Sequence, residues 1–113
     1  MLERTGDLFS APSTVSLAHC ISMDCAMGKG IAKQFSERFG RVDEIRRQVV
    51  KVGGVAILKV KERYVYNLVT KEKYYEKPTM RALRLSLQEM RKHVEENSVI
   101  SILTSWTGGR SRF

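Results

Sequence analysis

Long hydrophobic runs are absent from this chain. No stretch reaches the roughly 18 consecutive apolar residues that a membrane-spanning helix needs, so no such helix is expected. Residues 1–6 also lack the apolar stretch of a signal peptide, and a secreted protein is not expected. Cysteine is scarce: Cys20 and Cys25 are the only two, which fits reduced thiols and a place in the nucleus or cytoplasm.

Acidic residues are also few. The 12 Asp and Glu residues are outnumbered by 20 Lys and Arg residues, which gives a net charge of +8. This excess favours polyanionic partners, either nucleic acid or a phosphate-rich ligand. Alternatively, the charges lie on solvated helix faces and in a basic tail. With 113 residues, 42% of them hydrophobic, the chain is expected to form one domain with one core.

The spacing of apolar residues predicts strands that alternate with helices. Strands are expected before Gly6 and over residues 15–21, 55–60, 63–69 and 99–103. Helices are expected over residues 28–39, 42–50 and 78–97, with Pro78 in the first turn of the last one. Their inward faces are expected to carry Ile31, Phe35 and Phe39; Val42, Ile45 and Val49; and Leu83, Leu87, Met90 and Val94. This alternation predicts an α/β sheet with helices on both faces.

Two glycines open the helix that follows the strand over residues 15–21, in the segment Gly28-Lys29-Gly30. A glycine-rich helix start gathers free backbone N–H groups that bind anions such as phosphate. The segment is not a Walker loop, since no Gly precedes Gly28 at the required spacing, and the third glycine of a dinucleotide fingerprint is missing. Ser22 and Asp24, just before it, could cap the helix or bind a ligand. A purely structural helix start is the alternative.

A second group near this loop, formed by His19, Cys20 and Cys25, resembles part of a zinc site. The cysteine spacing does not match a zinc motif and a fourth ligand is missing. His19 and Cys20 would also point to opposite sides of a strand, so a histidine packed in the core is favoured. Lys71 ends a predicted strand and is a candidate nucleophile if a cleft desolvates it. Otherwise it is a solvated lysine.

Several short motifs occur in one order along the chain: Gly6-Asp7-Leu8-Phe9, the stretch 16–22, Asp24-Cys25, Met27-Gly28-x-Gly30-Ile31-Ala32, Phe39-Gly40, Thr70-Lys71 and Lys77-Pro78-Thr79. Together they closely resemble one subclass of the macrodomain family, the O-acetyl-ADP-ribose deacetylases, also called terminal ADP-ribose protein glycohydrolases. The resemblance covers roughly residues 5–102. On this basis residues 1–103 are identified as a partial macrodomain.

The resemblance implies a three-layer α/β/α fold with a mixed central sheet that binds ADP-ribose at the strand ends. Lys71 would attack the anomeric carbon of the distal ribose and release a protein glutamate or an acetyl group. The expected ligand contacts are Asp7 and Leu8 on adenine, Thr70 beside the distal ribose, and His19, Ser22, Asp24, Met27, Gly28, Lys29, Gly30 and Ile31. No metal or organic cofactor is implied. The expected partners of this monomer are ADP-ribose, O-acetyl-ADP-ribose or an ADP-ribosylated protein.

The chain departs from the family after the last predicted strand. There the family has a Pro-Arg-Ile-Gly-x-Gly-Leu-Asp loop, whose aspartate assists the lysine, followed by a helix and a strand. Residues 104–113 are instead a basic, glycine-containing tail, and no Asp or Glu follows Glu96. A macrodomain without its last helix and strand, with weak or absent hydrolysis, is therefore expected. A frame-shifted or alternatively spliced transcript is one explanation for the tail.

Two other functions stay open. The chain could bind ADP-ribose without turnover, as a reader or an inactive fragment. It could also bind nucleic acid or poly(ADP-ribose) through a basic surface, although no nucleic-acid-binding module is recognised. That surface would include Arg46, Arg47, Lys51, Arg81, Arg84, Arg91 and Lys92. The resemblance also implies roles in the DNA damage response and in purine nucleoside metabolism.

Overall fold

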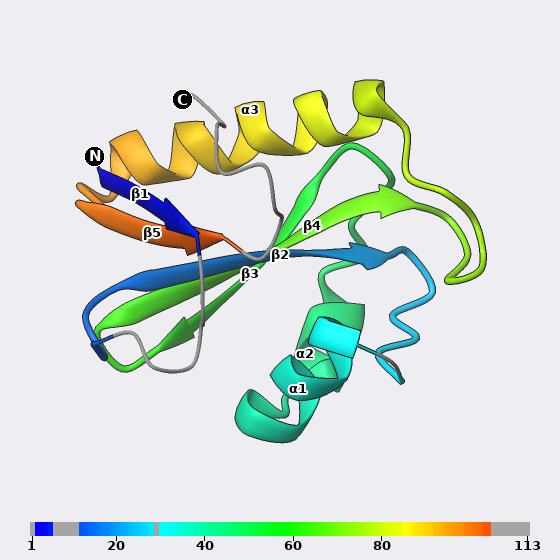
Figure 1. The fold of residues 1–113 in the computed structure, drawn as a ribbon, viewed down its shortest axis with the longest axis horizontal. Coiled ribbons are helices and arrows are strands. Elements are labelled where there is room, and N and C mark those ends of the chain that lie inside the picture. Colours follow the sequence, from blue (N-terminus) through cyan, green and yellow to red (C-terminus); the bar gives the residue numbers. More distant parts are fainter. Residues whose placement is uncertain (1, 6–11, 29, 105–113) are drawn as a thin grey trace.

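The computed structural model describes residues 2–5, 12–28 and 30–104. In chain order their elements are β1 (Leu2–Thr5), β2 (Ser16–Ser22), α1 (Gly30–Phe39), α2 (Val42–Arg47), β3 (Val55–Val60), β4 (Arg63–Lys71), α3 (Met80–Glu96) and β5 (Ser101–Thr104) (Figure 1). None of the helices in these ranges is long and apolar enough to cross a membrane.

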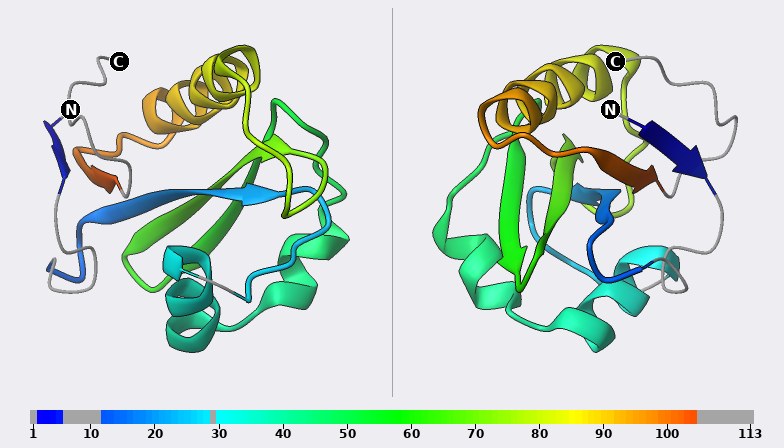
Figure 2. Two further views of the ribbon diagram at one scale, coloured as in Figure 1. Left: turned by 45° about the vertical axis from the view of Figure 1, so that its right-hand side comes forward. Right: turned by 90° about the vertical axis from the view of Figure 1, so that its left-hand side faces the viewer.

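The strands form one five-stranded sheet in the order β1-β5-β2-β4-β3. Every neighbouring pair is parallel except β3 and β4, which form an antiparallel hairpin. α3 covers one face of the sheet, and α1 and α2 cover the other (Figure 1 and Figure 2). The predicted α/β fold, with three layers and a mixed sheet, is therefore confirmed.

The central strands β2 and β4 are buried on both faces, which explains their nearly continuous apolar sequences. On one face, Leu17 of β2 belongs to a core cluster with Phe35 of α1 and Ile45 of α2. On the other face, Ala18 packs in a second cluster with Met90 of α3. Successive β2 side chains thus pack into opposite layers, and the sheet separates two hydrophobic cores.

The end of α2 differs from the prediction. The helix stops at Arg47, and the expected inward side chain of Val49 is instead 77% exposed, with a positive φ of 50°. The side chain of Gln48 donates to the Ile57 carbonyl at 2.9 Å and accepts from the Ile57 N–H at 3.0 Å. These bonds satisfy backbone groups on the edge strand β3. The prediction for Val49 is wrong because this tertiary contact ends the helix first.

The start of α3 is set by a side-chain cap. Thr79 has an extended backbone, and its hydroxyl accepts a hydrogen bond from the Ala82 N–H at 3.0 Å. Pro78 therefore precedes the helix instead of lying in its first turn. Met90 and Val94 face the core as predicted, and the two predicted leucines pack against it while partly buried.

Two further boundaries are shifted. α1 begins at Gly30, which leaves Gly28 in the loop before the helix. The last strand was expected over residues 99–103 and is found at Ser101–Thr104. Thr104, the first residue of the predicted tail, pairs with β1 and β2. The remaining tail lies outside the described residues.

His19, at the centre of β2, is fully enclosed in the core. Its ring stacks on Phe35 with centroids 3.7 Å apart, and its Nε2 lies 2.5 Å from Asn67 Oδ1. The Asn67 nitrogen donates to the Ala56 carbonyl at 3.0 Å, so its oxygen faces the histidine and Nε2 is assigned the proton. Burial lowers the pKa of His19 to about 4, although the hydrogen bond to Asn67 acts in the opposite direction.

This buried histidine makes folding sensitive to acid. His19 takes up a proton near pH 6.5 in the unfolded chain and near pH 4 in the folded chain. The stability that depends on neutral His19 is therefore fully present above pH 6.5 and is lost as the pH falls toward 4. We expect the free energy of unfolding to fall by about 3 kcal/mol between pH 7 and pH 4 because of this group. Urea denaturation across this range measures the change. His19→Gln should flatten this part of the curve, and an unchanged slope in that variant would contradict the assignment.

Candidate functional site

The carboxyl ends of the parallel strands β2 and β4 lie side by side at the centre of the sheet. Ligands in open α/β sheets bind at such strand ends. The two strands pair in register up to Ile21 with Val69, and the register then shifts so that Ser22 pairs with Lys71. Two predicted site residues, Ser22 and Lys71, are therefore neighbours on adjacent strands.

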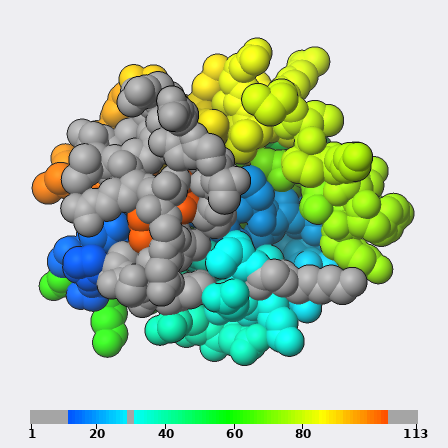
Figure 3. Space-filling model, viewed as in Figure 1, coloured from blue at the N-terminus to red at the C-terminus, as the bar shows by residue number. Residues whose placement is uncertain are grey.

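Backbone hydrogen bonds continue this pairing into the loops that follow the strands. The Met23 N–H donates to the Lys71 carbonyl at 2.8 Å, and the Asp24 N–H donates to the Glu72 carbonyl at 3.1 Å. Figure 3 shows the end of β2 recessed between α1 and the segment that leads into α3. The site is thus a recess whose floor extends the sheet.

The carboxylate of Asp24 joins these two loops. Its Oδ1 accepts hydrogen bonds from the Ser22 hydroxyl and from the Ala26 N–H at 3.1 Å, and its Oδ2 accepts from the Tyr74 N–H at 3.2 Å. Partial burial acts to raise the pKa of Asp24, but these hydrogen bonds and the Lys73 ammonium outweigh it and hold the pKa below its ordinary value. Asp24 is therefore ionised at neutral pH and fixes one loop against the other.

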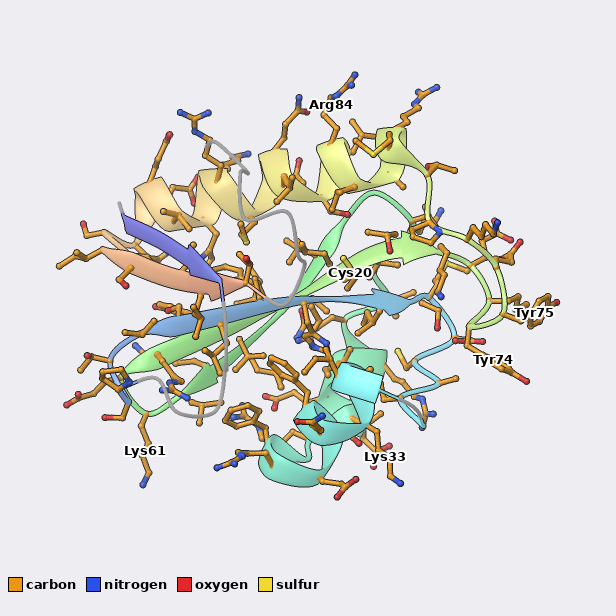
Figure 4. The ribbon with its side chains drawn as sticks, viewed as in Figure 1. Cys20, Lys33, Lys61, Tyr74, Tyr75 and Arg84 are labelled. Atoms are coloured by element: carbon orange, nitrogen blue, oxygen red, sulfur yellow. The ribbon has the colours of Figure 1, made fainter. Side chains whose placement is uncertain are left out.

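The amine of Lys71 is held by the same short loop. Its Nζ donates to the Tyr74 carbonyl at 2.9 Å, while the Tyr74 N–H bonds to Asp24. The side chains of Tyr74 and Tyr75 project away from the fold (Figure 4) and are 57% and 73% exposed. No sequence signal predicted the part played by Tyr74, because Tyr74 acts through backbone groups that any residue other than proline carries.

Cys20 and His19 face opposite layers of the structure. Cys20 points toward α3 (Figure 4) and packs against the cluster around Met90, whereas His19 packs against α1. This arrangement argues against a shared zinc site. In the ranges that the structure describes, no group of three His, Cys, Asp or Glu residues could hold a metal ion.

Thr70 lies beside Cys20 on the α3 side of the sheet. It is 2% exposed, and its hydroxyl lies against the Cys20 thiol. Burial raises the pKa of the Cys20 thiol, and the Thr70 hydroxyl and the Lys71 ammonium partly offset this rise. Cys20 is therefore a packed thiol on the α3 side of the sheet, next to Thr70 and Lys71.

The predicted phosphate loop runs from Ser22 to the start of α1. Met27 is buried, and Ile31 packs against the core from α1. Gly28 is exposed, and a Cβ added to it would meet no atom of the described residues within 4 Å. The packing of the described residues therefore does not require glycine at this position. A ligand that approaches the backbone closely would require it, and a helix start offers unpaired N–H groups to an anion.

The structure brings together Ser22, Asp24 and Lys71 among the predicted site residues. His19 has no exposed surface, so it supports the site from the core and offers no contact to a surface ligand. Asp7, Leu8 and Lys29 lie outside the described residues, and their contacts stay predictions.

No family model matches the chain. The chain is 50% identical over 97 residues to the Homo sapiens protein named ADP-ribose glycohydrolase OARD1, a match that covers 86% of the chain and 64% of that relative. The macrodomain of Thermus aquaticus DarG has the same fold, with a TM-score of 0.80 and 24% identity over 96% of the chain and 81% of that structure. The chain belongs to the macrodomain family.

This macrodomain also resembles Thermosipho africanus DarTG, whose structure is a complex with ADP-ribose. The TM-score is 0.72, with 15% identity over 89% of the chain and 32% of that structure. The fold of this macrodomain is therefore shared with a protein that holds the nucleotide. The chain spans 64% of the length of the human relative.

Removing the Asp24 carboxylate from this macrodomain is expected to loosen both loops. Asp24→Ala leaves three hydrogen-bond donors without their acceptor, so the free energy of unfolding should fall by about 1–2 kcal/mol. Amide hydrogen exchange should accelerate at Ala26 and Tyr74, whose N–H groups the carboxylate accepts. Glu72→Ala, an exposed carboxylate two residues before Tyr74, is the matched control. Equal protection of the Tyr74 amide in both variants would argue against this role.

Proposed function

We propose that this macrodomain binds ADP-ribose at the carboxyl ends of β2 and β4, with the diphosphate against the loop that precedes α1. The exposed Gly28, which the packing of the chain does not need, is the observation that carries the proposal. The name of the human relative and the complex of the T. africanus neighbour with ADP-ribose support the choice of ligand. The net charge of +8 favours a doubly phosphorylated compound.

The hydrogen bonds between the two loops also support binding. Met23, Asp24 and Tyr74 fix the loops in the absence of a ligand. A site that is already ordered loses little conformational entropy when the ligand arrives. The loop after β2 is therefore ordered at Met23 and Asp24 before a ligand arrives.

A methyl group on Gly28 tests where the phosphate lies. Gly28→Ala is expected to leave the melting temperature unchanged, because the methyl group meets no atom in the part of the chain that the structure describes. It should weaken ADP-ribose binding about tenfold by moving the phosphate away from backbone N–H groups. Calorimetric titration measures the affinity, with Gln34→Ala on the exposed side of α1 as a control. Unchanged affinity in Gly28→Ala would place the phosphate elsewhere.

We further propose that Lys71 gives the site a hydrolytic activity toward ADP-ribose linked to a carboxylate, as in a modified glutamate or an acetyl ester. The Lys71 nitrogen attacks the anomeric carbon of the distal ribose with its lone pair, and a nitrogen–carbon bond forms. The bond from that carbon to the acyl oxygen breaks, and the carboxylate leaves with the electron pair. One amine proton passes to water. The nitrogen lone pair then opens the ribose ring: the bond from the anomeric carbon to the ring oxygen breaks, that oxygen takes a proton from water, and a Schiff base forms. Water hydrolyses the Schiff base, which frees ADP-ribose and restores the Lys71 amine.

Turnover is proposed to be slow. Residues 105–113, which stand where the family resemblance would place the acid/base loop, contain no Asp or Glu and supply no such partner. Loss of a general acid or base typically lowers a rate about 10²–10⁴-fold. Lys71 can still form the Schiff base, since that step uses its own lone pair.

A hydrolysis assay on a protein carrying glutamate-linked ADP-ribose tests the role of Lys71. Lys71→Ala is expected to lower the release of ADP-ribose about a hundredfold or more and to abolish covalent trapping by a borohydride. Lys73→Ala, a neighbouring exposed lysine, should keep both signals. Release that persists at the full rate in Lys71→Ala would eliminate this nucleophile.

Binding by the unaltered chain without any release would instead identify a reader.

The described basic side chains do not favour the other alternative, a nucleic-acid surface. Lys33, Lys61 and Arg84 project from α1, from the β3–β4 turn and from α3, respectively (Figure 4). Charges spread in this way are typical of solvated surfaces.

A further inference from the structure

A cavity of about 370 Å³ lies under the loop that follows β2, on the face of the sheet that α2 covers. Its volume is at the lower end of the range of small-ligand pockets, roughly 300–1,000 Å³. Ile21, Ala56 and Val69 from three adjacent strands form its floor, and Ile45 and Val50 form a side wall. The interior is therefore apolar and sized for a small molecule.

This cavity is separate from the proposed ADP-ribose site. Of the predicted ligand residues that the structure describes, Asp24 alone lines it. Both oxygens of that carboxylate are engaged by Ser22, Ala26 and Tyr74. Ser22 and Lys71, the other two residues that the structure brings together at the proposed site, do not line the cavity.

Two cations line the cavity, Arg46 and Lys51. The nearest carboxylate recorded for Arg46 is that of Asp43, at 3.8 Å, and both side chains are more than half exposed. Such a pair contributes little, so Asp43 does not hold Arg46 away from a ligand, and Arg46 also interacts with the Cys25 thiol. Within the described residues, Lys51 has no ion-pair partner. Burial raises the pKa of the Cys25 thiol, which also lines the cavity, so the thiol is uncharged and does not repel an anion.

Apolar side chains are also left in water at the wall of the cavity. Met23 is 41% exposed and Val49 is 77% exposed. Val49 adopts a positive φ, which is unfavourable for a β-branched residue and tends to occur at functional sites. Exposed apolar side chains beside cations match a ligand that is part hydrocarbon and part anion.

We propose that this cavity binds a small carboxylate with an unbranched hydrocarbon chain. The chain lies against Ile21, Ala56 and Val69, and the carboxylate lies between Arg46 and Lys51. Burial of the hydrocarbon supplies most of the affinity, and the two cations select an anionic head group over a neutral or cationic one.

Calorimetric titration of the chain with octanoate tests this inference, with octylamine and acetate as matched probes. Octanoate should bind at least about tenfold more tightly than octylamine, which has the same hydrocarbon chain and the opposite charge. It should also bind more tightly than acetate, which lacks the chain. Saturating ADP-ribose should not displace it. Equal binding of octylamine, no binding of octanoate, or competitive displacement by ADP-ribose would each overturn the proposal.

A pair of charge reversals locates the site. Arg46→Glu with Lys51→Glu should weaken octanoate binding about tenfold or more, because both cations that line the cavity are lost. Arg47→Glu with Lys33→Glu makes the same change in net charge at residues that do not line the cavity. All four side chains are exposed, so the fold should be retained, and circular dichroism checks it. An equal loss of affinity in both variants would show a general charge effect and overturn the assignment.

Discussion

The parallel pairing of β2 with β4, and the one-residue shift at its end, is the constraint on which the rest of the site depends. Without the shift, Ser22 would pair with Thr70, because Ile21 pairs with Val69. Side chains alternate across a strand, so a shift of one residue changes which side chains share a face. The shift leaves Thr70 in the core and sets Lys71 beside Ser22, where its amine reaches the loop.

Asp24 turns this strand pairing into a fixed three-dimensional site. A carboxylate that accepts hydrogen bonds from both loops stays ionised, and it holds Tyr74 where the Tyr74 carbonyl meets the Lys71 amine. The predicted nucleophile and the predicted ligand loop are therefore positioned by one short network. That network lies entirely within described residues and rests on the central strands, which are the most buried part of the sheet.

The sequence predicted the elements better than their ends. Strands buried on both faces have continuous apolar sequences, so β2 and β4 were predicted close to their bounds, and the edge strand β3 was predicted at its bounds. Helix ends depend on single tertiary contacts: Gln48 bonds to the edge strand and stops α2, and Thr79 caps α3. The motifs indicated Asp24 and Lys71 as site residues. Tyr74 was missed because its contribution comes from the backbone.

The loop after β2 forms a wall of both the proposed ADP-ribose site and the proposed carboxylate cavity. The Asp24 carboxylate accepts a hydrogen bond from Tyr74 at the first site, and Asp24 also lines the second. A ligand in either place would restrict the same few residues, so each would change the affinity of the other by the same factor. The two ligands strengthen each other's binding if both bound states prefer the same loop conformation, and they weaken it if the preferred conformations differ. Because the loop is already fixed by backbone bonds from Met23 and Asp24, little entropy remains for either ligand to remove, and the coupling is expected to be small.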